Sequence, residues 1–237
     1  MPSDIMPLVV AAASIGLFHT LLGSDHYLPF VAMSKSGRWS MRKTAVITAL
    51  CGLGHVAGSV VLGVLGIAIG AAVGTLEFVE SIRGDLAAWG LTAFGLIYFV
   101  LGVRKALRDR PHQHDHAHSV SHRHVHTHTH SDDHLHAHGT EAVGGSTPWV
   151  LFAIFLFGPC EPLIPLLMYP AAQGSAYGVV AVALVFAVTT VVTMLAVVLG
   201  VVSSVRPVEV GRMSRYTHAI AGGTVCKCGV SIQLLGL

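Results

Sequence analysis

Apolar residues fill six long stretches of the chain, and shorter, more polar segments separate them. The stretches cover residues 8–33, 44–73, 86–103, 149–170, 178–202 and 216–237, the last interrupted by Lys227. Each is close to or above the roughly 20 residues that an α-helix needs to cross the hydrocarbon of a bilayer. The pattern therefore predicts an all-α polytopic membrane protein with six transmembrane helices.

The composition agrees with a membrane location. Hydrophobic residues make up 53% of the chain and charged residues 11%, whereas soluble domains average about 25% charged residues. The first apolar stretch lacks a basic segment before it and a small-residue cleavage site after it, so we expect a span rather than a signal peptide. No phosphate-binding glycine loop or nucleophile–base motif is present. We therefore expect no enzyme activity, no ATP coupling, no resident cofactor and no nucleic-acid partner.

Basic residues gather in three of the five connections between the predicted spans. They are Lys35, Arg38, Arg42 and Lys43 in the first, Arg104, Lys105, Arg108, Arg110 and Arg123 in the third, and Arg206, Arg212 and Arg215 in the fifth. Cytoplasmic loops carry an excess of Lys and Arg. The distribution predicts an inner-membrane protein with these three loops in the cytoplasm and both termini outside.

Two of the apolar stretches contain an acid at the same distance from a proline. Asp25 and Glu161 lie four residues before Pro29 and Pro165. A proline has no N–H to bond the carbonyl four residues earlier, so each helix is expected to kink or open near its acid. A charge at mid-bilayer costs roughly 2.5–3.5 kcal/mol, and such residues usually mark an ion or substrate path.

The two acids also suggest an internal repeat. Aligning them places Leu62-Gly63 beside Leu199-Gly200 with one gap. Three spans in each copy would invert the second copy relative to the first. This predicts an inverted 3+3 repeat with membrane units at residues 1–105 and 148–237 and a loop at 106–147. The alternative is that glycine-rich apolar helices align with one another without any repeat.

The loop is rich in histidine. Twelve histidines lie between Pro111 and Gly139, often at every second position, and almost no apolar residues accompany them. Such a segment cannot bury a core, so we expect it to be disordered. Neutral imidazole suits zinc, copper, nickel and cobalt. The tract is interpreted as a metal-capture or sensing segment, with a plain solvated linker as the alternative.

Several polar residues within the spans are candidate metal ligands. They are His19, Asp25 and His26 in the first span, His55 in the second, and Cys160 and Glu161 in the fourth. Seven residues separate His19 from His26, or about 10 Å in an unbroken helix, so an opened turn is needed to bring them together. The alternatives are hydrogen-bonded structural histidines and a small buried cysteine.

Four charged residues lie between the second and third apolar stretches. Glu77, Glu80, Arg83 and Asp85 are expected to lie in a solvated outer loop, or at an entrance for metal.

The spacing His19-(x5)-Asp25-His26 resembles the H-x4-D-H signature of nickel/cobalt permeases, with one extra residue. Six spans and a His-rich cytoplasmic loop resemble the NicO/RcnA branch of that superfamily. The resemblance implies transport of a divalent transition-metal ion, nickel or cobalt first, with His19, Asp25, His26 and His55 as ligands. The expected mechanism is alternating access about a midplane site, and the sequence does not indicate the direction of transport.

Two other functions remain open. The segment from Phe157 to Pro165 resembles the Pro-Cys segments of transmembrane thiol–disulfide carriers of the DsbD type, which also have inverted three-span repeats. Those carriers need a cysteine in each repeat, whereas Ser24 stands where the first repeat would place one, and Cys51 lies in the second span. The other function is that of a metal-binding accessory or sensor protein that transports nothing.

Overall fold

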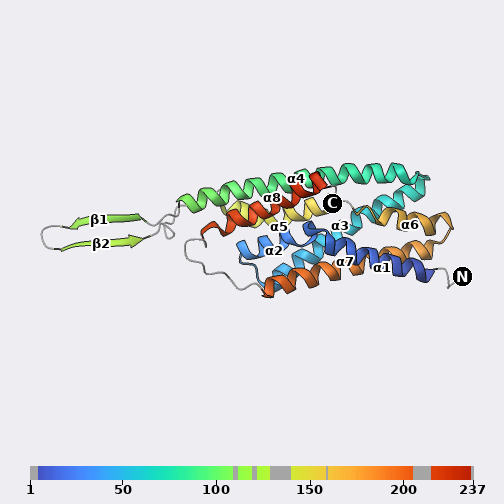
Figure 1. Cartoon of the computed structure of the whole chain (residues 1–237), viewed down its shortest axis with the longest axis horizontal. Helices are drawn as coiled ribbons and strands as arrows, with labels where there is room; N and C mark the ends of the chain where they lie inside the picture. Colours follow the sequence, from blue (N-terminus) through green and yellow to red (C-terminus); the bar gives the residue numbers. More distant parts are fainter. Residues whose placement is uncertain are drawn as a thin grey trace.

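The computed structural model describes residues 5–108, 112–118, 122–128, 140–158, 160–204 and 215–235. These residues form eight α-helices, one 3₁₀ helix and two strands. The helices lie along one common direction in a single elongated bundle (Figure 1). They are α1 (Ile5–Leu22), η2 (Ser24–His26), α2 (Leu28–Ser36), α3 (Met41–Ile69), α4 (Val73–Arg108), α5 (Thr140–Phe157), α6 (Leu163–Ala172), α7 (Ala176–Ser204) and α8 (Thr217–Leu235).

The bundle has the dimensions and the surface of a multi-pass membrane protein. Among the described residues, α1, α3, α4 and α7 are long and apolar enough to cross a bilayer. Large hydrophobic side chains are widely exposed on their outer faces, as lipid contact requires. The all-α membrane fold is therefore confirmed, and the inverted 3+3 repeat remains a prediction.

The first and fourth predicted spans are each built from two shorter helices. α1 ends at Leu22 and α2 begins at Leu28, while α5 ends at Phe157 and α6 begins at Leu163. The predicted opening at Asp25 and Glu161 is thus confirmed, but by a different mechanism. Pro29 lies in the first turn of α2, where a missing N–H breaks no helical hydrogen bond. It begins a new helix instead of kinking an old one.

The third predicted span is much longer than its apolar part. α4 has 36 residues, which at 1.5 Å per residue is about 54 Å. It includes Glu80 and Arg83, which the sequence placed in a solvated loop. Buried residues recur along α4 at 76, 80, 84, 87, 88, 91 and 95, a helical spacing that puts Glu80 on the buried face. The loop prediction is wrong for Glu80, which is 0% exposed.

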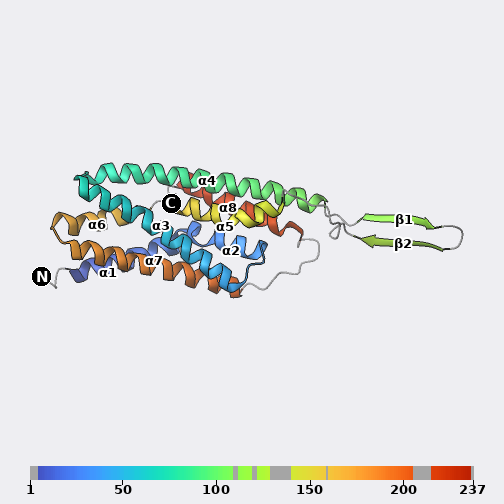
Figure 2. The same ribbon diagram turned by 180° about the vertical axis from the view of Figure 1, so that it is seen from behind.

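Glycines let α4 and α8 pack with their backbones in contact. A Cβ at Gly95 would collide with the backbone nitrogen of Cys226, and one at Gly102 would collide with that of Ala219. Gly222 on α8 meets the backbone of Phe99 in the same way. The two helices lie side by side in both views (Figures 1 and 2).

Part of the histidine tract forms a hairpin. Strands β1 (His112–His118) and β2 (His122–His128) pair in antiparallel fashion and extend away from the helical bundle (Figure 1). The register places His112 opposite His128 and His114 opposite His126. The whole tract was expected to be disordered, and these two strands were not predicted. Residues 109–111, 119–121 and 129–139 lie outside the described part of the chain.

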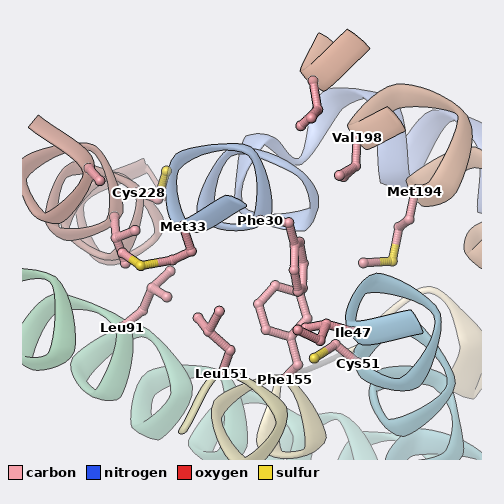
Figure 3. Close-up of a cluster of buried hydrophobic side chains, with 13 residues drawn as sticks. Phe30, Met33, Ile47, Cys51, Leu91, Leu151, Phe155, Met194, Val198 and Cys228 are labelled. Atoms are coloured by element: carbon pink, nitrogen blue, oxygen red, sulfur yellow. The ribbon is translucent and has the colours of Figure 1, made fainter. Parts of the chain in front are cut away.

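The largest apolar core joins both halves of the chain. Phe30 and Met33 of α2 pack with Leu151 and Phe155 of α5, and Leu91 of α4 lies beside them (Figure 3). All five side chains are buried. This core packs α2, which follows the first break, against α5, which precedes the second break. The positions of the two breaks relative to each other are therefore fixed.

Candidate functional site at the two helix breaks

Three histidines from separate elements meet at the first break. His19 lies in the last turn of α1, His26 in η2 and His55 in α3. One ring nitrogen from each lies within 4.8 Å of the other two. The Nε2 atoms of His26 and His55 are 3.3 Å apart, and the ring centroids of His19 and His26 are 4.7 Å apart. The break at residues 23–27 thus achieves the approach that an unbroken helix would prevent.

Asp25 orients one of these rings. Nδ1 of His26 lies 3.2 Å from Oδ1 of Asp25 and 3.2 Å from the carbonyl oxygen of Gly23. Both oxygens accept hydrogen bonds, so Nδ1 carries the proton and Nε2 presents its lone pair towards His55. A Cβ at Gly23 would lie 2.5 Å from Nδ1 of His26, so only glycine leaves room for the ring. Asp25 was predicted as a ligand; its carboxylate contacts Nδ1 of His26, and it also lines the same cavity as the three histidines.

Cys160 and Glu161 lie at the second break with opposite exposure. The Cys160 side chain is fully buried, and its sulfur is 3.9 Å from Nε2 of His19. Glu161 is exposed. It lines a cavity of about 300 Å³ that His19, Asp25, His26 and His55 also line. The structure therefore gathers all six predicted residues, five around the cavity and Cys160 next to His19.

A buried ion pair that the sequence did not predict supports the second break. Nη1 of Arg83 donates to Oε2 of Glu80 at 2.9 Å, and Nη2 donates to the carbonyl oxygen of Leu156 at 3.0 Å. Gly58 of α3 makes room for this guanidinium, because a Cβ there would collide with Nη2. The sequence signal was available: Glu80 shares a helical spacing with the small buried residues Gly84, Ala88 and Gly95.

Some buried polar atoms near the breaks have no hydrogen-bond partner within the described residues. They include Nδ1 of His55, Oγ of Ser59, Oε1 of Glu80 and Oγ1 of Thr190. Buried polar groups in proteins are nearly always paired with protein or with water. These atoms mark polar positions inside the bundle near the two breaks.

The cysteines are all free, and one lies beside the first break. The Cys228 side chain on α8 is buried and lies close to the side chain of Ser24. Cys51 lies at the other side of the core cluster from Cys228, with Phe30 and Leu151 between them in Figure 3. The Cys228 sulfur thus lies beside Ser24, the serine of the first break. Spacing along the chain does not predict this neighbour, because α8 is remote from Ser24 in the sequence.

Residues 15–231 match the model of the family described as Cytochrome C biogenesis protein transmembrane region. The chain belongs to this family. No curated protein and no solved structure matches it.

The family assignment corrects one sequence-based interpretation and supports another. The resemblance to nickel/cobalt transporters is wrong as a family assignment, because the matching model is that of a thiol–disulfide and cytochrome biogenesis family. The match supports the alternative function, a thiol–disulfide electron carrier, and gives metal transport no support. It agrees with the resemblance of the segment around Cys160 to the Pro-Cys segments of DsbD-type carriers.

Proposed function

We propose that the protein carries reducing equivalents across the membrane by thiol–disulfide exchange, with Cys160 as the reacting sulfur. The observation that carries this proposal is the position of Cys160: a buried thiol at a helix break, in a chain of this family. The break allows the residue to move without disrupting a continuous helix. His19, 3.9 Å from the sulfur, is placed to take the thiol proton when the thiolate forms.

Such exchange needs a second sulfur, and Cys228 is our candidate. It lies beside Ser24, so the first break receives its thiol from α8 instead of from its own segment. Both thiols are free in this structure. A disulfide needs Cα atoms about 4.4–6.8 Å apart, and we propose that the segment around Cys160 moves towards α8 when the disulfide forms.

The exchange balances in two steps. In the oxidised carrier a thiolate of a thioredoxin-like dithiol attacks the Cys160 sulfur, the bond between Cys160 and Cys228 breaks, and Cys228 leaves as a thiolate that takes up a proton. The partner's second thiol then attacks its own mixed-disulfide sulfur and releases Cys160. The carrier gains two electrons and two protons, and the partner becomes a disulfide. The reverse sequence at the other membrane face reduces an acceptor disulfide.

Substituting the cysteines tests this function. Cys160→Ser and Cys228→Ser should each abolish electron transfer from reduced thioredoxin to an acceptor disulfide across proteoliposomes, while Cys51→Ser should not. Glu161→Gln should have little effect on this transfer. Cys228→Ser should accumulate a mixed disulfide between Cys160 and the acceptor, because the Cys160 thiolate can attack the acceptor disulfide but the carrier has no second thiol to complete the exchange. Transfer at the wild-type rate by Cys160→Ser would contradict the proposal.

The three-histidine group favours a second function, transport of a divalent transition-metal ion. Its support is geometric only: three ring nitrogens lie within 4.8 Å of one another, and Asp25 orients His26 as carboxylates orient metal-bound histidines elsewhere. Nickel, cobalt and zinc suit such imidazole groups. For this function Asp25 serves as a positioning residue, while Cys160 and Glu161 are further candidate ligands. A metal-binding accessory that transports nothing would use the same residues.

Flux measurements distinguish the two functions. A metal carrier should move nickel, cobalt or zinc into proteoliposomes, lose that flux in His26→Ala, and keep part of it in Cys160→Ser. Glu161→Gln should then be more damaging than Cys160→Ser. A thiol carrier should show the reverse order and no metal flux, and an accessory protein should bind metal without moving it.

The orientation in the membrane is also a proposal. The turn between α2 and α3, the end of α4, the start of α8 and the hairpin lie at the same end of the bundle (Figure 1). Lys35, Arg38, Lys43 and Lys105 belong to this end. The positive-inside rule supports a cytoplasmic position for it, in the inner membrane of the cell.

A further inference from the structure

A second cavity lies at the basic end of the bundle, away from the helix breaks. Its volume is about 530 Å³, and it lies between the α2–α3 turn, α4 and α8. Four of the residues that line it can carry positive charge, and none of the described lining residues is acidic. The four are Arg38, Lys43, Lys105 and His218.

The three permanent cations of this cavity have no carboxylate partner within the part of the chain that the structure describes. The ion pairs found there join Asp25 to His26 and Glu80 to Arg83. The ammonium group of Lys43 lies over the ring of Trp39, 5.2 Å from its centroid. Positive charges that no described carboxylate pairs with repel one another around one polar hollow, so an anion placed between them would be stabilised.

The backbone of Arg38 gives an independent indication. α2 ends in a Schellman motif, with Trp39 N–H bonded to the Ser34 carbonyl at 2.9 Å and Arg38 N–H bonded to the Lys35 carbonyl at 3.4 Å. The residue at the Arg38 position of this motif is usually glycine, because it must adopt a left-handed conformation. Arg38 has φ of 49°, the only positive φ of a non-glycine residue in the described chain. Strain of this kind collects at functional positions.

Hydrogen-bonded polar groups complete the lining. The Tyr98 hydroxyl is 2.9 Å from Nδ1 of His218 and 3.4 Å from the Ser36 hydroxyl. These hydrogen bonds connect Tyr98 of α4 to α8 and to α2, so they join three of the helices that line the cavity. It also supplies O–H and N–H groups beside the cations, as a tetrahedral oxyanion requires for hydrogen bonding.

We propose that this cavity binds a phosphate-type anion, either the headgroup of an anionic phospholipid or free phosphate. A guanidinium binds phosphate oxygens in pairs, and lysine acts as a point charge. Basic pockets between transmembrane helices on the cytoplasmic side are known to take anionic headgroups. Arg38 lines the cavity from the α2–α3 turn, and Lys105 lines it from α4. The site is separate from the cysteines and histidines of the proposed function.

Native mass spectrometry of the full chain in detergent tests the proposal, with phosphatidylglycerol and phosphatidylcholine as lipid probes and inorganic phosphate titrated separately. Arg38→Gly and Lys105→Gln should each weaken binding of phosphatidylglycerol about fivefold, since a cation near a headgroup contributes on the order of 1 kcal/mol. Arg104→Gln is the matched control, because it removes an exposed charge next to Lys105 that does not line the cavity.

The outcomes distinguish a lipid headgroup from free phosphate, or show that the cavity binds neither. A lipid headgroup is identified if the protein prefers phosphatidylglycerol to phosphatidylcholine, if both variants reduce this preference, and if the Arg104→Gln control retains it. Equal binding of the two lipids, with phosphate binding that both variants reduce, identifies a soluble anion. If neither probe binds more weakly to the two variants than to the control, the proposal is wrong. Arg38→Gly relieves backbone strain, so its unfolding temperature should not fall, and lost binding cannot then be ascribed to misfolding.

Discussion

Arg83 on α4 donates a hydrogen bond to the carbonyl oxygen of Leu156, 3.0 Å away, in the last turn of α5. The last four carbonyls of a helix have no partner within it, and lipid offers none. The same guanidinium pairs with the fully buried Glu80. One residue of α4 therefore satisfies a backbone group at the second helix break and neutralises a buried acid.

Removing the guanidinium should destabilise the protein strongly. Arg83→Ala leaves Glu80 buried without its partner, and breaking a buried ion pair from one side costs about 3–5 kcal/mol. Unfolding in detergent micelles measures the change. The double variant Glu80→Met with Arg83→Met removes both charges at similar volume and should recover most of the loss. Equal instability of the single and double variants would show that the charge of Glu80 is not the cause.

Gly58→Ala should produce a milder form of the same defect. The added Cβ would lie 2.7 Å from the Leu156 carbonyl oxygen and collide with Nη2 of Arg83, so the guanidinium must shift. Overpacking of this kind typically costs about 1–3 kcal/mol. Gly200→Ala is the control, because nothing lies within 4 Å of its new Cβ and alanine favours a helix. A Gly58→Ala protein as stable as Gly200→Ala would contradict the tight fit.

Asp25→Asn should weaken cation binding at the three histidines without unfolding the bundle. Asparagine keeps the size of the side chain and can still accept from Nδ1 of His26, but it lacks the charge that stabilises a cation on that ring. Second-layer substitutions of this type lower metal affinity about 10–100-fold. Calorimetric titration with nickel and zinc measures the change, with the exposed Asp85→Asn as control. Unchanged affinity would remove Asp25 from the site.

Deleting residues 112–138 should leave the activity of the membrane bundle in place. β1 and β2 extend away from the helices (Figure 2), and both helix breaks lie within the bundle. Metal sensitivity or apparent metal affinity should change, since the deletion removes twelve histidines. Electron transfer and metal flux in proteoliposomes are the measurements. Loss of all activity at saturating substrate would show that the tract belongs to the transport path.

The breaks were predictable because local chemistry controls them. Asp25 and Glu161 are acids in apolar segments close to prolines, and each lies where one helix ends and another begins. The approach of His19 to His26 followed from opening that turn, and the geometric part of this prediction is confirmed. Whether these residues bind metal remains a prediction.

Other features depend on contacts between distant segments. Glu80 looked solvated because acids cluster before the apolar part of α4, although its helical spacing with buried residues pointed to the interior. The spacing does not reveal that its partner Arg83 also bonds Leu156 of α5. Cys228 reaches Ser24 through the packing of α8, which no spacing in the sequence reveals. The short His-Asp-His pattern led to the wrong family, whereas the Pro-Cys segment around Cys160 resembled the family that the chain matches.

The glycine contact between α4 and α8 limits how the protein can work. Because Gly95 and Gly102 bring the backbones together, these helices cannot slide or part without opening a gap that no side chain fills. In any cycle that exposes the site first to one face of the membrane and then to the other, α4 and α8 must keep their positions relative to each other. The movement is then left to the short segments around Gly23 and Gly158, where no regular α-helix has to be unwound.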